Sequence, residues 1–67
     1  MYQQKRNGEI LRELRGTRPR CYVAKQVGIS ESALAMYESG DRNPRDEVKL
    51  ALAKFYNKSV SEIFFTA

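Results

Sequence analysis

The chain has 67 residues, a formal net charge of +4 and a pI near 9.5, with one cysteine and no histidine. A chain of this length forms one domain that buries only about 60% of the surface exposed in its unfolded form, and such domains usually need disulfides, a metal or a partner subunit. Cys21 alone cannot form an intramolecular disulfide, and no recognisable zinc ligand set is present. Oligomerisation remains as the expected source of additional stability.

The residue inventory argues against catalysis and membrane insertion. The chain lacks histidine, the commonest general base, and Cys21 has no imidazole to activate it as a nucleophile. We therefore expect no catalytic residue, metal site, cofactor or small-molecule ligand. No apolar run approaches the roughly 20 residues that cross a bilayer, and the N-terminus lacks the apolar stretch of a secretion signal. These features predict a cytoplasmic protein that is not an enzyme.

The positive charge is unevenly distributed along the chain. Five of the eight acidic residues follow residue 37. Seven basic residues lie in the first half: Lys5, Arg6, Arg12, Arg15, Arg18, Arg20 and Lys25. A net positive charge suits a polyanionic partner, although such a charge is also common among ordinary soluble domains.

The predicted fold is all-α, a compact bundle of five short helices in one domain that spans residues 1–67. The first helix is expected at about residues 8–15, where Ile10, Leu11 and Leu14 recur at helical spacing, and Asn7 either caps this helix or lies within it. Gly16 follows at the position where a left-handed residue commonly ends a helix.

Two further helices are expected at residues 20–27 and 31–39. Pro19 precedes the second helix, and its fixed φ suits the first turn. Gly28 ends this helix, and Ser30 can cap the third by accepting a hydrogen bond from an amide of its first turn. Gly40 then closes the third helix.

The last two helices are expected at residues 45–56 and 60–65. The former begins after Pro44 and carries an apolar stripe, and Asn57 is suited to end it. Ser59 and Glu62 have the spacing of a capping box, which predicts one final helical turn.

The informative segment runs from Arg20 to Glu38 and predicts two short helices that cross steeply around Gly28. Such a crossing needs a small residue at the contact, which Ala24 supplies, and a turn residue that tolerates positive φ. The sequence here resembles the phage Cro and repressor (XRE-like) helix-turn-helix family. The similarity extends from Gly8 to Phe64 and rests on Leu11-Arg-Glu-Leu-Arg15, Val23-Ala24, Val27-Gly28-Ile29-Ser30, Tyr37-Glu38-Ser39-Gly40, Pro44 and Ser59-Val-Ser-Glu-Ile-Phe64.

The resemblance implies a regulator that binds double-stranded DNA as a homodimer and inserts its third helix into the major groove. It also implies that Glu38 pairs with an arginine of the first helix, here Arg15 or Arg12. The chain departs from the family pattern in the short connection between the first two helices and at Pro19, where a Ser or Thr cap is common. Glu31 and Met36 also stand where such proteins often carry Gln, Arg or Lys, which bears on the DNA sequence recognised.

Helical geometry gives candidates for base recognition. On a helix from residue 31 to 39, Leu34 and Tyr37 point inward, and the opposite face can enter a major groove about 12 Å wide. The base-reading candidates are Glu31, Ser32, Ala35 and Met36. Glu31 has an alternative role in complementing the helix dipole, whereas the outward position of Met36 favours contact with DNA.

A second group of residues is expected beside the DNA backbone, where contacts set the register of the protein without conveying sequence. These candidates are Arg18, Arg20, Lys25, Ser30, Ala33, Ser39, Arg42 and Arg45. About six phosphate contacts per dimer would give a slope of log affinity against log salt on the order of −5.

The aromatic and branched residues near the C-terminus are chiefly core residues in the simplest interpretation, but they exceed what one final turn can bury. The surplus suggests a dimer seam. The candidates are Tyr56, Ile63, Phe64 and Phe65. The main functional hypothesis is a repressor that binds a palindromic operator. The alternative is an antitoxin-like interaction module that binds a partner protein, and this second activity is compatible with DNA binding.

Overall fold

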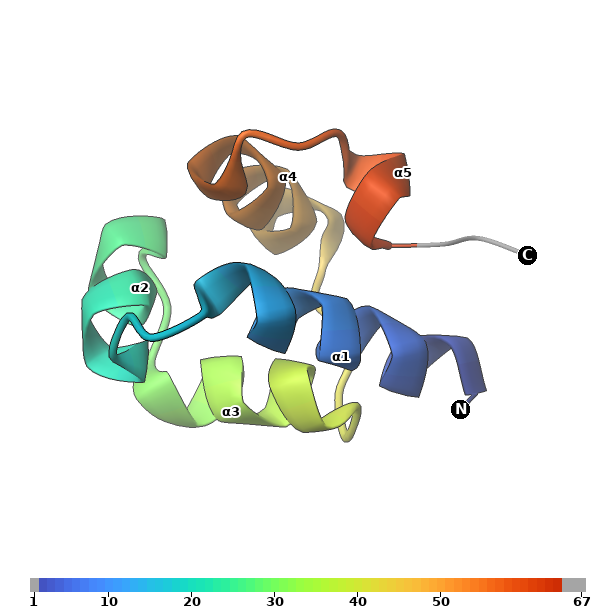
Figure 1. Ribbon diagram of the computed structural model, residues 1–67, viewed down its shortest axis with the longest axis horizontal. Helices are drawn as coiled ribbons and strands as arrows, with labels where there is room; N and C mark the ends of the chain where they lie inside the picture. Colours follow the sequence, from blue (N-terminus) through green and yellow to red (C-terminus); the bar gives the residue numbers. More distant parts are fainter. Residues whose placement is uncertain (1, 65–67) are drawn as a thin grey trace.

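The computed structural model describes residues 2–64, with side chains from Lys5 onward, and this part of the chain is all-helical (Figure 1). The helices are α1 (Tyr2–Arg15), α2 (Arg20–Val27), α3 (Glu31–Ser39), α4 (Asp46–Tyr56) and α5 (Val60–Ile63). The predicted all-α bundle of five helices is thus confirmed for the described residues. Phe65, which was expected in the last helix, lies outside them.

Helix α1 begins at Tyr2, so the expected start near residue 8 is wrong. Gly8 lies inside the helix and is buried against α3. A Cβ at Gly8 would collide with the carbonyl oxygen of Glu38 and would lie 2.7 Å from that of Tyr37. The glycine therefore marks the point where two helix backbones approach each other closely, and it does not mark a helix end.

The turn between α2 and α3 is built from local interactions. Gly28 ends α2 in the left-handed region, with φ of 89°, a conformation that costs a residue with a Cβ about 1–2 kcal/mol. The amides of Gly28 and Ile29 both donate to the carbonyl of Ala24, at 2.8 and 2.9 Å. The Ser30 hydroxyl then accepts a hydrogen bond from the Ala33 amide at 3.0 Å and caps α3. The chain consequently turns within three residues into a new helix direction.

The C-terminal helices are also defined by their ends. Asn57, with φ of 58°, ends α4. At α5 the capping box forms in full: the Ser59 amide donates to Glu62 Oε1 at 2.7 Å, and the Glu62 amide donates to Ser59 Oγ at 3.3 Å. This arrangement stabilises a helix that has only one turn.

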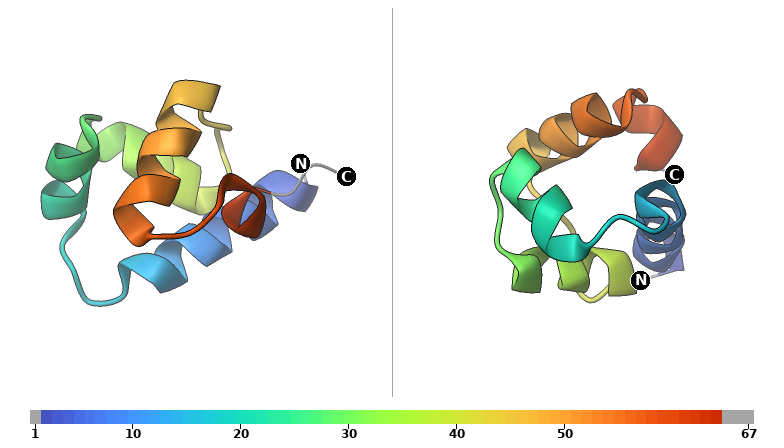
Figure 2. Two further views of the ribbon diagram at one scale, coloured as in Figure 1. Left: turned by 90° about the horizontal axis from the view of Figure 1, so that it is seen from above. Right: turned by 60° about the vertical axis from the view of Figure 1, so that its left-hand side comes forward.

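The helices surround one small core. Helix α1 packs on α3 and α5, α2 packs on α3 and α4, and α5 also packs on α4. Figure 1 and the right-hand view in Figure 2 show that α3 lies at one side of the molecule and α4 and α5 at the other. The buried apolar residues are Leu11, Val23, Ala24, Leu34, Leu52, Ala53, Tyr56, Ile63 and Phe64.

The burial of the C-terminal residues corrects the expected dimer seam. Tyr56, Ile63 and Phe64 are 8%, 0% and 2% exposed, so their side chains are core residues of a single chain. Helix α5 packs against α1 as well as against α4, which accounts for the burial of its apolar side chains. Phe65, the fourth residue of the expected seam, lies outside the described residues.

Candidate nucleic-acid interface

Helix α3 has one buried and one open face. Leu34 is fully buried, whereas Glu31 and Ser32 are exposed and Met36 retains 39% exposure. Ala35 is partly buried. The views in Figures 1 and 2 place α3 along an edge of the described molecule, with α1 on its inner side. The outer face of α3 is therefore open to a ligand.

The four base-reading candidates all lie on α3, but they differ in chemistry. Ser32 is an exposed hydroxyl that can donate or accept at a base edge, and Met36 and Ala35 can contact a thymine methyl group. Glu31 is the only acidic residue in the first turn of α3, where its charge complements the helix dipole. It can also accept a hydrogen bond from a cytosine amino group.

All five cations expected at the DNA backbone are exposed: Arg18, Arg20, Lys25, Arg42 and Arg45. Arg42 and Arg45 lie in the connection that leads from α3 to α4, and Arg45 directly precedes α4. Lys25 lies in the last turn of α2. These cations therefore come from the segments on either side of α3 in the sequence.

Arg18 has a different, structural environment. Its Nη2 donates to the Leu14 carbonyl at 2.6 Å and its Nε to the Arg15 carbonyl at 3.2 Å, so it satisfies the C-terminal end of α1. Its guanidinium carbon also lies 5.3 Å from the ring centroids of both Phe55 and Tyr56, within the range of cation–π attraction. These contacts hold Arg18 against its own chain while its side chain stays exposed, and its expected contact with the DNA backbone stays a prediction.

The three small residues expected at the DNA backbone also take part in local structure. The Ser30 hydroxyl caps α3, and Ala33 supplies the amide that it accepts from. The Ser39 hydroxyl lies 3.1 Å from the Met36 carbonyl and 2.9 Å from Asp41 Oδ2, both of which are acceptors. The single proton of Ser39 is thus used within the protein.

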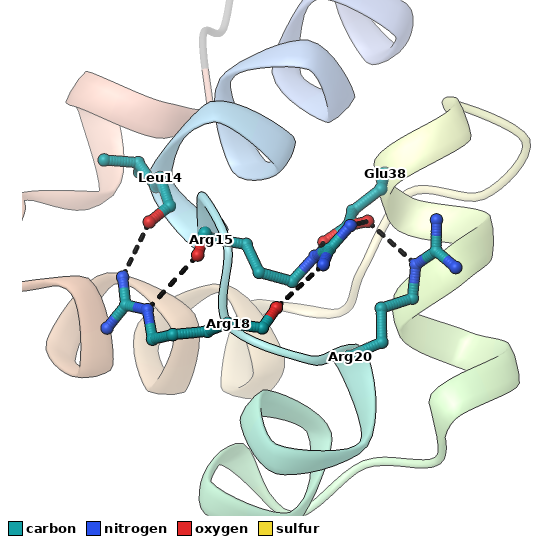
Figure 3. Close-up of polar contacts among 5 residues, drawn as sticks. All are labelled: Leu14, Arg15, Arg18, Arg20 and Glu38. Carbon is teal, nitrogen blue, oxygen red and sulfur yellow. Dashed lines mark hydrogen bonds and ion pairs between the residues drawn. The ribbon is translucent and has the colours of Figure 1, made fainter.

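A buried carboxylate joins the first three helices. The side chain of Glu38 is 1% exposed. Arg15 donates from Nε to Glu38 Oε2 at 2.7 Å and from Nη2 to Oε1 at 3.2 Å, while Arg20 donates from Nε to Oε1 at 3.0 Å (Figure 3). The hydrogen bond from Arg15 to Glu38 is the main reason that the pKa of Arg15 is raised. The pair with α1 that the family resemblance implied is present, and Arg15 is the partner.

Sequence reasoning missed two features of this region. The contact between Arg20 and Glu38 spans 18 residues, and sequence reasoning assigned Arg20 to phosphates alone. The role of Gly8 was also missed, although a glycine inside an apolar helical pattern is itself a signal of close packing. Both features determine how α3 is held against α1 and α2.

Two further properties concern the described part of the chain as a whole. No helix among residues 2–64 has the length and apolar character needed to cross a membrane. The described residues also bring together no group of three or more His, Cys, Asp or Glu side chains that could hold a metal ion.

Comparison with known proteins places this geometry in a family. The model of a family described as helix-turn-helix matches residues 10–63, which is most of the chain. Searches of curated proteins and of solved structures find no significant match. The chain belongs to the helix-turn-helix family of Cro and repressor (XRE) type, a family of DNA-binding transcription regulators.

Proposed function

From the membership of this chain in the helix-turn-helix family, we propose that it is a repressor that binds a palindromic operator as a dimer and inserts α3 into the major groove. The observation that carries the proposal is the open outer face of α3, with Ser32 and Met36 exposed on it. A major groove about 12 Å wide admits a helix in this orientation. Base contacts from this face supply sequence selectivity.

The cations around α3 supply the contribution that is independent of sequence. Lys25, Arg42 and Arg45 are exposed and can contact phosphates on both sides of the groove. Each neutralised phosphate releases counterions, so affinity falls as the salt concentration rises. We expect about six such contacts in a dimer, which corresponds to a slope of log affinity against log salt near −5.

The proposed dimer covers two half-sites about one helical turn, or roughly 34 Å, apart. Because Tyr56, Ile63 and Phe64 are buried in each chain, the dimer contact uses other surface residues. Light scattering after size exclusion measures the mass of the free protein and of its operator complex. A complex with one chain on an operator that has two half-sites would contradict the proposed dimer.

The test of DNA recognition is a polarisation titration with duplexes from the region that flanks the gene of this protein. We expect selective, salt-sensitive binding to a fragment that contains an inverted repeat. Ser32→Ala or Met36→Ala should change discrimination at one or two base pairs by about 1–3 kcal/mol. Arg45→Ala should instead weaken binding to every duplex alike. If all three variants weakened every duplex equally, the assignment of α3 to base reading would be refuted.

A further inference from the structure

Two arginines share one buried carboxylate at the junction of α1, α2 and α3. The Glu38 carboxylate can neutralise only one of the guanidinium groups of Arg15 and Arg20. The junction therefore carries one excess positive charge. Its location depends on how each guanidinium is bound.

All three nitrogens of the Arg15 guanidinium are occupied within the protein. Nε and Nη2 donate to Glu38, and Nη1 donates to the Arg18 carbonyl at 2.8 Å. Its side chain is only 15% exposed. Arg15 thus acts as the internal partner of Glu38.

Arg20 is bound differently. It uses Nε alone, in a hydrogen bond of 3.0 Å to Glu38 Oε1, and its side chain is 42% exposed. Its two Nη groups make no hydrogen bond to the described residues, and in Figure 3 they point away from the carboxylate. A guanidinium held at Nε keeps its planar pair of Nη donors available, and this pair matches the oxygens of a phosphate.

We propose that Glu38 is a positioning residue for DNA binding, which holds Arg20 through Nε so that both Nη groups of Arg20 face one backbone phosphate. This inference rests on the proposed function and adds to it a contact that depends on a side chain with no access to DNA. The orientation of Arg20 is set before DNA binds, which reduces the side-chain entropy lost on binding. The hydrogen bond to Glu38 also couples this phosphate contact to the packing of α3.

The experiment measures the affinity for a random-sequence duplex of 30 base pairs as a function of salt, because phosphate contacts are independent of sequence. Arg20→Ala should reduce the magnitude of the salt slope by about 0.9 for each bound chain. It should also weaken binding roughly ten- to a hundredfold at low salt. Lys54→Ala is the matched control, since Lys54 is an exposed cation in the last turn of α4. The control should retain the slope of the original protein.

The positioning role is tested by Arg20→Lys, which keeps the positive charge at an exposed site. An ammonium that pairs with Glu38 cannot also present a planar pair of donors. On a logarithmic scale, the loss of affinity caused by Arg20→Lys should therefore be at least half of the loss caused by Arg20→Ala. A lysine variant with the original affinity would overturn the positioning role and leave a simple charge effect.

A double-mutant cycle tests the coupling between the two residues. Where circular dichroism shows that Glu38→Gln is folded, the effect of Arg20→Ala on DNA affinity should be at least threefold smaller in that background. Equal effects in both backgrounds would overturn the inference, as would an unchanged salt slope for Arg20→Ala. A failure of the original protein to bind any duplex would instead refute the proposed function.

Discussion

The substitution Gly8→Ala tests the packing of α1 on α3 most directly. An added Cβ would collide with the Glu38 carbonyl oxygen, and would lie 2.7 Å from the Tyr37 carbonyl oxygen and 2.8 Å from the Glu38 carbonyl carbon. Ordinary contacts between a Cβ and a backbone atom lie at about 3.5 Å, so the helices must separate by roughly 0.8 Å or more. These atoms belong to the α3 backbone and cannot rotate away.

Two opposing contributions determine the size of the effect. Alanine is favoured over glycine inside a helix by about 1 kcal/mol. Overpacking usually costs about 1–3 kcal/mol, and we expect the upper end because the contact is with the α3 backbone. The net prediction for Gly8→Ala is a loss of about 2 kcal/mol in the free energy of unfolding, or roughly 10 °C in Tm for a domain of this size.

The assay is thermal and urea denaturation followed by circular dichroism, with Gly28→Ala as the matched control. A Cβ at Gly28 would meet nothing within 4 Å, so its cost comes from the φ of 89° alone. We expect the control to lose about 1–2 kcal/mol. A Gly8→Ala protein with an unchanged or raised Tm would refute the close approach of the two helices, because helix propensity would then outweigh the contact.

Two further substitutions probe individual polar groups. Tyr56→Phe removes a buried hydroxyl that has no hydrogen-bond partner among the described residues. The free energy of unfolding in urea should therefore stay unchanged or rise by about 1 kcal/mol. A loss above about 1 kcal/mol would show that the hydroxyl does have a hydrogen-bond partner. Burial, together with the charge of Glu38, raises the pKa of Tyr56. The pH-dependent stability that this shift provides is therefore complete below the unfolded pKa of about 10, and it is lost as pH rises through the pKa of the folded state. The Phe variant should accordingly lose less stability than the original protein in urea titrations above pH 10. Ser59→Ala should cost about 1 kcal/mol in the same assay because it removes the capping box, and an unchanged unfolding midpoint would show that α5 depends on tertiary packing alone.

The ends of most helices could be read from local sequence. Pro19, Gly28 and Ser30 act through backbone angles or through hydrogen bonds to residues at most four positions away. The capping box of Ser59 and Glu62 acts within one turn. Such interactions depend little on the rest of the fold. The helix-turn-helix segment and the candidate recognition face could therefore be predicted from the sequence.

Contacts between distant residues were decided only by folding. The sequence pattern showed an apolar face that began near Gly8, but only the close approach of α3 explains why a residue without a Cβ fits at this position. The sequence could not separate the C-terminal apolar residues that belong to the core from a surplus that would form a dimer seam, and the packing of α5 on α1 and α4 buried Phe64. Likewise, the charge of Arg20 was evident in the sequence, but its hydrogen bond to Glu38 exists because the crossing of α2 and α3 brings residues 18 positions apart together.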